Sequence, residues 1–269
     1  MWGSRKMTLH IALDGISGTG KTTMIKKLSE FLSKKSYNVK TLLQPQDKTI
    51  LYILNNYNLT ISEIALLMAL DRSLTWNYED FKDYDIVLWD RCILSDYAYH
   101  TDEDVKAAFI RNINKYFPDM DIYIVIHSEE ILQDRDYINQ CKVIQKYDVL
   151  IDGYLNVHKV DYIPGDPEKV FEDIVETIFT VLPTCKWCGR LFKKSVSNKK
   201  YCCLKCKNYA KEEQNRNNFR NFYNRYKDTM SESKKGALGS KGANLHGKAN
   251  SDHEVELKLI NNEKRRLGI

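Results

Sequence analysis

Short apolar runs alternate along the chain with stretches in which apolar residues recur at helical spacing. The runs lie at residues 7–13, 38–43, 84–89, 121–126 and 157–163, and each is short enough to be one buried strand. Between them apolar residues recur every three or four positions, as in 21–36 and 167–182. Strands that alternate with helices build a parallel sheet covered by helices, so we predict an α/β fold with a five-stranded parallel sheet.

The start of one helix can be predicted in detail. Thr60 and Glu63 form a capping box, and apolar residues follow at three- and four-residue steps. This spacing puts Met68 and Arg72 one turn apart on the same helix face. The last helix of this part begins near Pro167 and ends before Pro183.

The pattern changes after residue 183 and predicts four segments. We expect a nucleotide-binding domain over 1–183, a basic cysteine-rich module over 184–228, a flexible linker over 229–250 and a short terminal helix over 251–269. The charge divides at the same place: residues 184–269 carry 21 Lys and Arg against 8 Asp and Glu, a net charge of +13, whereas the preceding residues carry 20 against 28, a net charge of −8. A basic tail on an acidic body indicates a polyanionic partner for the tail.

The expected cellular location rests on two signals that the sequence lacks. It has no run of about 18 apolar residues, and "MWGSRKMTLHIAL" lacks the apolar core and cleavage site of a secretory signal. We therefore expect an intracellular, cytoplasmic protein with no membrane partner. Five of the seven cysteines fall between 185 and 206; in an intracellular chain they indicate a metal site, the alternative being a disulfide framework.

A glycine-rich motif follows the first predicted strand. "GISGTGKT" at 15–22 fits G-x4-G-K-[ST] and leads into a helix. In such a loop backbone N–H groups surround a phosphate, Lys21 reaches the β- and γ-phosphates, and the Thr22 hydroxyl ligates Mg²⁺. A glycine turn without a ligand is the alternative. The residues expected to bind ATP are Gly15, Ile16, Ser17, Gly18, Thr19, Gly20, Lys21, Thr22 and Thr23.

An acidic and a basic residue, Asp90 and Arg91, end the third predicted strand. Ligands bind at the carboxyl ends of strands in an open parallel sheet, so Asp90 should meet the molecule held by the loop. Asp90 could hold Mg²⁺ or take a proton from the acceptor, and Arg91 could hold an acceptor phosphate. A surface salt bridge is the alternative.

Four segments, "LDGISGTGKTT", "ALLMALDRSLTW", "DRCILSDYAYH" and "PDMDIYIVIHSEEILQDR", together resemble the thymidylate kinase family over residues 7–182. The resemblance implies a P-loop kinase fold and transfer of the ATP γ-phosphoryl group to dTMP, giving dTDP and ADP. By position, Arg72 and Arg91 would grip the acceptor phosphate and Asp90 would serve the metal or the acceptor. Ser95 and Tyr99 would line the nucleoside pocket. A homodimer is a possible assembly.

The chain departs from this family in several places. Ser17 stands where the family usually has an acid, Met68 where it has an aromatic ring, and Asp96 where it often has an amide for base recognition. Arg135 is the candidate for a catalytic lid arginine, and Cys141 belongs to a helical stretch that mostly packs. The alternatives are a deoxynucleoside kinase and a nucleic-acid-binding protein with a degenerate ATP-binding kinase domain.

The cysteine spacing predicts one zinc site. Cys185 and Cys188 are followed, after thirteen residues, by Cys202 and Cys206 or, shifted by one position, by Cys203 and Cys206. Four thiolates close a tetrahedral Zn²⁺ site that is structural. The segment also resembles short zinc ribbons, which would make Cys202 the third ligand.

Basic and aromatic residues surround this site and continue beyond it. Phe219, Phe222, Tyr223 and Tyr226 recur at helical spacing among Arg216, Arg220 and Arg225. Such a pattern indicates a nucleic-acid surface, although the aromatic residues could also pack as a small core beside a zinc site that only stabilises the fold. The basic residues near the cysteines are Lys186, Arg190, Lys193, Lys194, Lys199, Lys200, Lys205 and Lys207.

Overall fold

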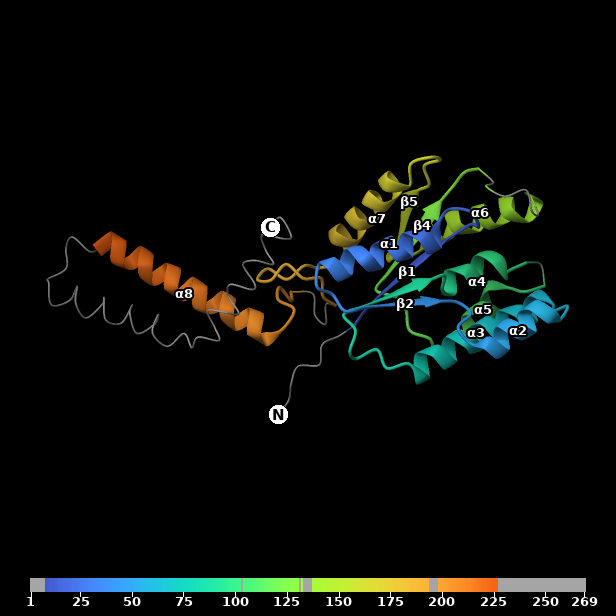
Figure 1. Ribbon diagram of the computed structural model, residues 1–269, viewed down its shortest axis with the longest axis horizontal. Coiled ribbons are helices and arrows are strands. Elements are labelled where there is room, and N and C mark those ends of the chain that lie inside the picture. Colours follow the sequence, from blue (N-terminus) through green and yellow to red (C-terminus); the bar gives the residue numbers. More distant parts are fainter. Residues whose placement is uncertain (1–7, 103, 131, 133–136, 194–197, 227–269) are drawn as a thin grey trace. The chain divides into compact units, whose positions relative to one another are not determined.

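The computed structural model describes residues 8–102, 104–130, 132, 137–193 and 198–226 (Figure 1). The chain divides after the helix that ends at Val181 into two compact units, the first of which is Lys6–Leu182. The predicted linker 229–250 and terminal helix 251–269 lie outside the described residues.

The first unit contains the predicted five-stranded parallel sheet. The strands are arranged in the order β2-β3-β1-β4-β5, and every pair is parallel. The first strand extends two residues beyond its apolar run, because Asp14 and Gly15 still pair with β4. The strands are β1 (Leu9–Gly15), β2 (Val39–Leu43), β3 (Ile86–Asp90), β4 (Ile122–His127) and β5 (Val157–Asp161).

Helices cover both faces of the sheet (Figure 1). On one face α1 and α7 contact the strands and each other, and on the opposite face α4 and α6 do so. The capping box is present at the start of α3, where the Thr60 hydroxyl accepts from the Glu63 N–H and Glu63 accepts from the Thr60 N–H. The helices of this unit are α1 (Lys21–Lys34), α2 (Lys48–Asn56), α3 (Ile61–Tyr78), α4 (Ile93–Tyr99), α5 (Ala107–Ile113), α6 (Tyr137–Gly153) and α7 (Pro167–Val181).

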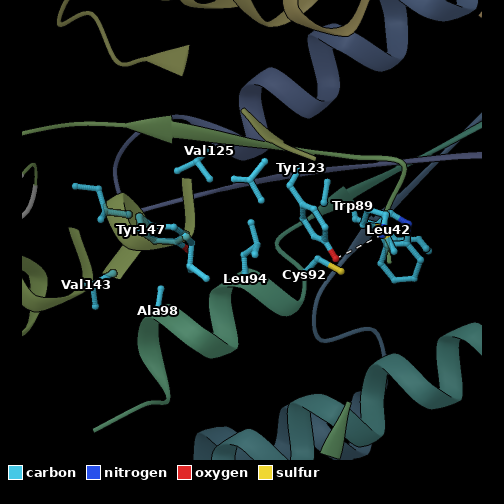
Figure 2. Packing of buried hydrophobic residues seen from close by; sticks show 14 of the residues in the cluster. Leu42, Trp89, Cys92, Leu94, Ala98, Tyr123, Val125, Val143 and Tyr147 are labelled. Carbon is cyan, nitrogen blue, oxygen red and sulfur yellow. Dashed lines mark hydrogen bonds between the residues drawn. The ribbon is translucent and has the colours of Figure 1, made fainter. Parts of the chain in front are cut away.

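The central strands are buried along their whole length, because helices cover them on both sides. All residues of β1, β3 and β4 are buried. Figure 2 shows Leu94 and Ala98 projecting from α4 within the cluster that also contains Tyr147 of α6. This packing fixes α4 and α6 at the same edge of the sheet as the loop that follows β1. None of the described helices is long and apolar enough to cross a membrane.

The second unit contains the helix α8 (Leu204–Tyr226). The helix begins earlier than its aromatic and basic pattern predicts, so that Cys206 lies in its first turn. The reason is packing, because Cys206 is buried with Cys185, Cys188 and Trp187 in one small cluster.

Gly15 is the position at which β1 can leave the sheet. Its φ is +134°, and a Cβ there would collide with the carbonyl oxygen of Ile126 on β4. We expect Gly15→Ala to lower the free energy of unfolding by about 2 kcal/mol or more, since both strain and collision must be relieved. Gly153→Ala at the end of α6 meets nothing within 4 Å and is the matched control. Urea unfolding of both variants measures this, and equal stabilities would contradict it.

Candidate active site and candidate metal centre

The loop between β1 and α1, residues 16–20, which we name the phosphate loop, has the backbone of an anion-binding turn. Gly18 and Gly20 have φ values of 94° and 78°, which glycine adopts without strain. Gly20 is the N-cap of α1, and no side chain caps the first N–H groups of that helix. The positive end of the helix dipole therefore faces the loop, which suits a phosphate group.

Lys21 is buried inside this loop. Its Nζ donates to the carbonyl oxygen of Ile16 at 2.5 Å and lies 3.4 Å from the Thr19 hydroxyl. Burial, with repulsion from Arg91, lowers the pKa of Lys21 to about 7. A polyanion in the loop would favour the charged ammonium and raise this pKa again.

The two residues predicted to hold Mg²⁺ are in direct contact. The Thr22 hydroxyl donates to Asp90 Oδ2 at 2.5 Å, which joins the first turn of α1 to the carboxyl end of β3. Thr22 is exposed and Asp90 is buried. A hydroxyl and a carboxylate are oxygen donors of the kind Mg²⁺ prefers, so this pair fits the ion.

Arg91 gathers several of the predicted acceptor residues. Its Nη1 donates to the Gly15 carbonyl at 3.3 Å and to Ser95 Oγ at 3.4 Å, and its Nη2 donates to Ser17 Oγ at 3.4 Å. The guanidinium lies 5.1 Å from the centre of the Tyr99 ring. Arg91 also has a φ of 69°, a conformation that non-glycine residues rarely adopt and that often marks functional positions. A cation is thus held beside the phosphate loop.

Asp14 completes this group, although it is not among the predicted site residues. It is fully buried, its Oδ1 accepts a hydrogen bond from Ser95, and the Tyr147 hydroxyl lies 3.3 Å from the same oxygen. Its Oδ2 has no partner among the described residues. Burial raises the pKa of Asp14 to about 6. The sequence feature that could have identified Asp14 is its place as an acid at the end of the strand that precedes the glycine loop.

Arg72 and Asp96 form a second, separate network. Arg72 is fully buried, pairs with Asp96, and donates to Gln44 at 3.1 Å and to Asn114 at 2.9 and 3.1 Å. A carboxylate at 96 compensates this buried charge, as an amide could not. These bonds use four of the five N–H groups of Arg72, and its predicted grip on the acceptor phosphate stays a prediction. Met68 lies half-buried one turn earlier on α3.

Arg135, the predicted lid arginine, lies outside the described residues. Lys146 donates to the carbonyl oxygens of Ala98 and Thr101, which places it at the carboxyl end of α4. It therefore serves that helix end rather than the loop between β1 and α1.

The second unit brings four thiols together. The sulfur atoms of Cys185, Cys188, Cys202 and Cys206 all lie within 4.8 Å of one another, with 3.7 Å between Cys188 and Cys202 and 3.5 Å between Cys202 and Cys206. Sulfur atoms bound to one tetrahedral Zn²⁺ at about 2.3 Å lie about 3.8 Å apart. Cys203 is outside this set, and none of the seven cysteines forms a disulfide. The cluster therefore fits a zinc ion.

The turn around the first pair explains why these thiols meet. Gly189 has a φ of 73°, its N–H donates to the Cys185 carbonyl at 2.8 Å, and the Cys185 N–H donates to Arg190 at 2.8 Å. Trp187 and Phe192 are buried beside the thiols. So small a core gives little stability alone, which makes a metal ion a reasonable further constraint.

The helix α8 exposes most of its charge. Phe222 is 48% exposed, while Arg216, Phe219 and Tyr223 are half-buried along one face. Exposed cations and partly exposed aromatic rings therefore lie together on this helix. The exposed cations on this helix are Lys205, Lys207, Lys211, Arg220 and Arg225.

The family match to known proteins falls within the first unit. The thymidylate kinase family profile matches residues 13–148. The probable thymidylate kinase of Methanosphaera stadtmanae is 30% identical over 188 residues, which cover 62% of this chain and 93% of that protein. The probable thymidylate kinase 1 of Saccharolobus solfataricus is 31% identical over 183 residues, covering 62% and 95%.

A solved structure shows the same fold. The thymidylate kinase of Ehrlichia chaffeensis superposes with a TM-score of 0.54 at 20% identity, covering 64% of this chain and 98% of that one. More than a third of this chain lies outside each of these three matches.

Proposed function

This chain belongs to the thymidylate kinase family, and we propose that it transfers the γ-phosphoryl group of ATP to dTMP, giving dTDP and ADP. The observation that carries this proposal is the contact between Thr22 and Asp90. It sets an oxygen-donor pair beside the phosphate loop, and Arg91 follows Asp90 directly. A phosphate donor, a metal and an acidic acceptor each have a suitable partner there.

The chain's own residues then divide the work. The loop amides and Lys21 would hold the β- and γ-phosphates, and Thr22 and Asp90 would hold Mg²⁺. When bound, Mg²⁺ neutralises charge on the phosphate oxygens. Arg91 would hold the acceptor phosphate opposite the γ-phosphate. A phosphate monoester has already lost most of its second proton at neutral pH, so this acceptor needs no general base.

The acceptor pocket is proposed around the same arginine. Ser95 and Tyr99 would line it beside Arg91, which both contact. The Arg72–Asp96 pair and Met68 would lie toward the base, where a thioether offers a softer contact than an aromatic ring. A deoxynucleoside kinase is the second candidate, because Asp90 and Arg91 at the end of β3 would also serve an acceptor hydroxyl.

The direct test is release of ADP from ATP and Mg²⁺ with dTMP, dUMP, other monophosphates and nucleosides as acceptors. We expect dTMP to give the highest kcat/KM, and Lys21→Ala to lower it by about 10²-fold or more, because a positioned charge on the transferred group is lost. Lys26→Ala, on the exposed side of the same helix, is the matched control.

The result also separates the candidates. A nucleoside that exceeds every monophosphate would replace the proposal with a nucleoside kinase. If no acceptor raises ADP release above that of Lys21→Ala, the kinase function is wrong.

For the second unit we propose a structural zinc ion held by Cys185, Cys188, Cys202 and Cys206. The support is the distance between the four thiols. Four protein ligands leave no open position, so this ion would stabilise the fold and take no part in the reaction.

We also propose that α8 and the basic residues near the zinc site bind nucleic acid. The support is the net charge of +13 after residue 183, together with exposed cations and the exposed Phe222 ring on one helix. A homodimer stays a prediction; the exposed apolar residues Leu51 and Tyr52 of α2 and Leu66 and Leu70 of α3 are candidates for its interface.

Zinc content tests the ligand set within the full chain. We expect about one zinc per chain in the wild type and none in Cys185→Ser with Cys188→Ser, because two of four thiolates are removed. Cys203→Ser should keep its zinc, since that thiol lies outside the cluster. The metal is measured by atomic spectroscopy after gel filtration.

Two outcomes would contradict the proposed zinc site. Loss of zinc from Cys203→Ser, or its retention in the double variant, would refute the ligand set.

The nucleic-acid surface is tested by the salt dependence of binding to a labelled oligonucleotide. We expect the affinity to fall steeply between 50 and 200 mM salt, and an affinity that does not would refute binding through the basic residues.

A further inference from the structure

Asp14 is a buried acid that the proposed reaction does not use. Its backbone is fixed because it pairs with Val125 of β4 near the end of β1. Its side chain is completely excluded from solvent, and Oδ2 has no partner among the described residues. An ionised carboxyl in such a place is costly unless its hydrogen bonds and neighbouring charges are used.

The hydrogen bonds that lead from Arg91 through Ser95 to Asp14 have one consistent direction. A serine hydroxyl has one hydrogen, and Ser95 donates it to Asp14 Oδ1. The lone pairs of Ser95 Oγ therefore remain to accept from Nη1 of Arg91, 3.4 Å away. The Tyr147 hydroxyl, 3.3 Å from the same carboxylate oxygen, can donate there as well.

The charges around Asp14 favour an ionised carboxylate, which accepts the hydrogen bond from Ser95. Arg91 and Lys21 are the cations that face the Asp14 carboxyl, from the end of β3 and from α1. Ser95 and Tyr147 approach it from α4 and α6. The Asp14 carboxylate is therefore the anionic end of a relay whose other end is the guanidinium beside the phosphate loop.

We propose that Asp14 is a positioning residue for the acceptor site, which holds the Ser95 hydroxyl as a hydrogen-bond acceptor and so aims the Arg91 guanidinium at the acceptor phosphate. This role rests on the proposed function, because it presumes that Arg91 binds that phosphate. Asp14 acts through Ser95 and touches neither ATP nor the reacting oxygen. Its effect should thus appear in the binding of dTMP and not in that of ATP.

The near-isosteric Asp14→Asn tests this relay. An amide can donate its own hydrogen to Ser95 and reverse that hydroxyl, which leaves Arg91 facing a hydrogen instead of a lone pair. We expect the dissociation constant for dTMP, measured by calorimetry, to rise about 10-fold or more. The dissociation constant for Mg·ATP should change less than about 2-fold. Thermal unfolding confirms that the variant is folded.

A double-mutant cycle distinguishes the relay from a merely structural effect. If Asp14 acts through Ser95, Asp14→Asn should weaken dTMP binding much less in a Ser95→Ala background than in the wild type.

The pH dependence of dTMP binding gives a second test of the relay. Burial raises the pKa of Asp14, so the carboxylate exists above about pH 6 and is lost as the pH falls through it. The ratio of the two dTMP dissociation constants, variant to wild type, should therefore shrink toward one below pH 6.

Failure of the relay can be distinguished from failure of the proposed kinase function. Equal effects of Asp14→Asn in both backgrounds, or equal losses for dTMP and Mg·ATP, would overturn the relay while wild-type kinase activity stands. A wild type that neither binds dTMP nor releases ADP with it would overturn the proposed function, and the relay with it.

Discussion

The hydrogen bond between Thr22 and Asp90 is the contact on which the arrangement of the site depends. It ties the first turn of α1 to the last residue of β3, two elements that are 68 residues apart in sequence. Because Leu13 pairs with Asp90 in the sheet, the phosphate loop leaves β1 directly beside this contact. Gly15 then allows the close approach to β4, so three strands and one helix meet at one edge.

That edge carries an unusual amount of buried charge. Asp14, Lys21 and Asp90 are buried around the phosphate loop together with the half-buried Arg91, and the buried Arg72 of α3 pairs with the buried Asp96 of α4. Each of these groups would be costly alone, but each has an opposite charge or a hydrogen-bond partner close to it. Burial is the main cause of both the lowered pKa of Lys21 and the raised pKa of Asp14. Such groups give little to stability, and their concentration here is best explained by function.

The sheet and the loop were predictable because their signals are local. Short apolar runs gave the strands, and the glycine motif with a following helix gave the loop. The extension of β1 to Gly15 was not predictable, because pairing with Val125 and Ile126 supports it. Asp14 was missed for a similar reason: its partners Ser95 and Tyr147 lie 81 and 133 residues away.

Other features of the site also depend on distant partners. The burial of Arg72 follows from Gln44, Asp96 and Asn114, which come from three different segments. In the second unit the cysteine spacing did not decide whether Cys202 or Cys203 belongs to the cluster. The fold decides this, because only the Cys202 thiol lies close to those of Cys185, Cys188 and Cys206. Spacing therefore predicts which residue types meet, whereas packing selects the individual residue.

The central claim is that Asp90, held by Thr22, serves a metal that accompanies ATP. Asp90→Asn keeps the size of the side chain and an oxygen that can accept from Thr22, but removes the charge. Calorimetric titration with ATP should show equal affinities for the variant and the wild type in EDTA, and an affinity about 10-fold lower for the variant in Mg²⁺. Equal affinities in Mg²⁺, or an equal loss in both conditions, would contradict the account.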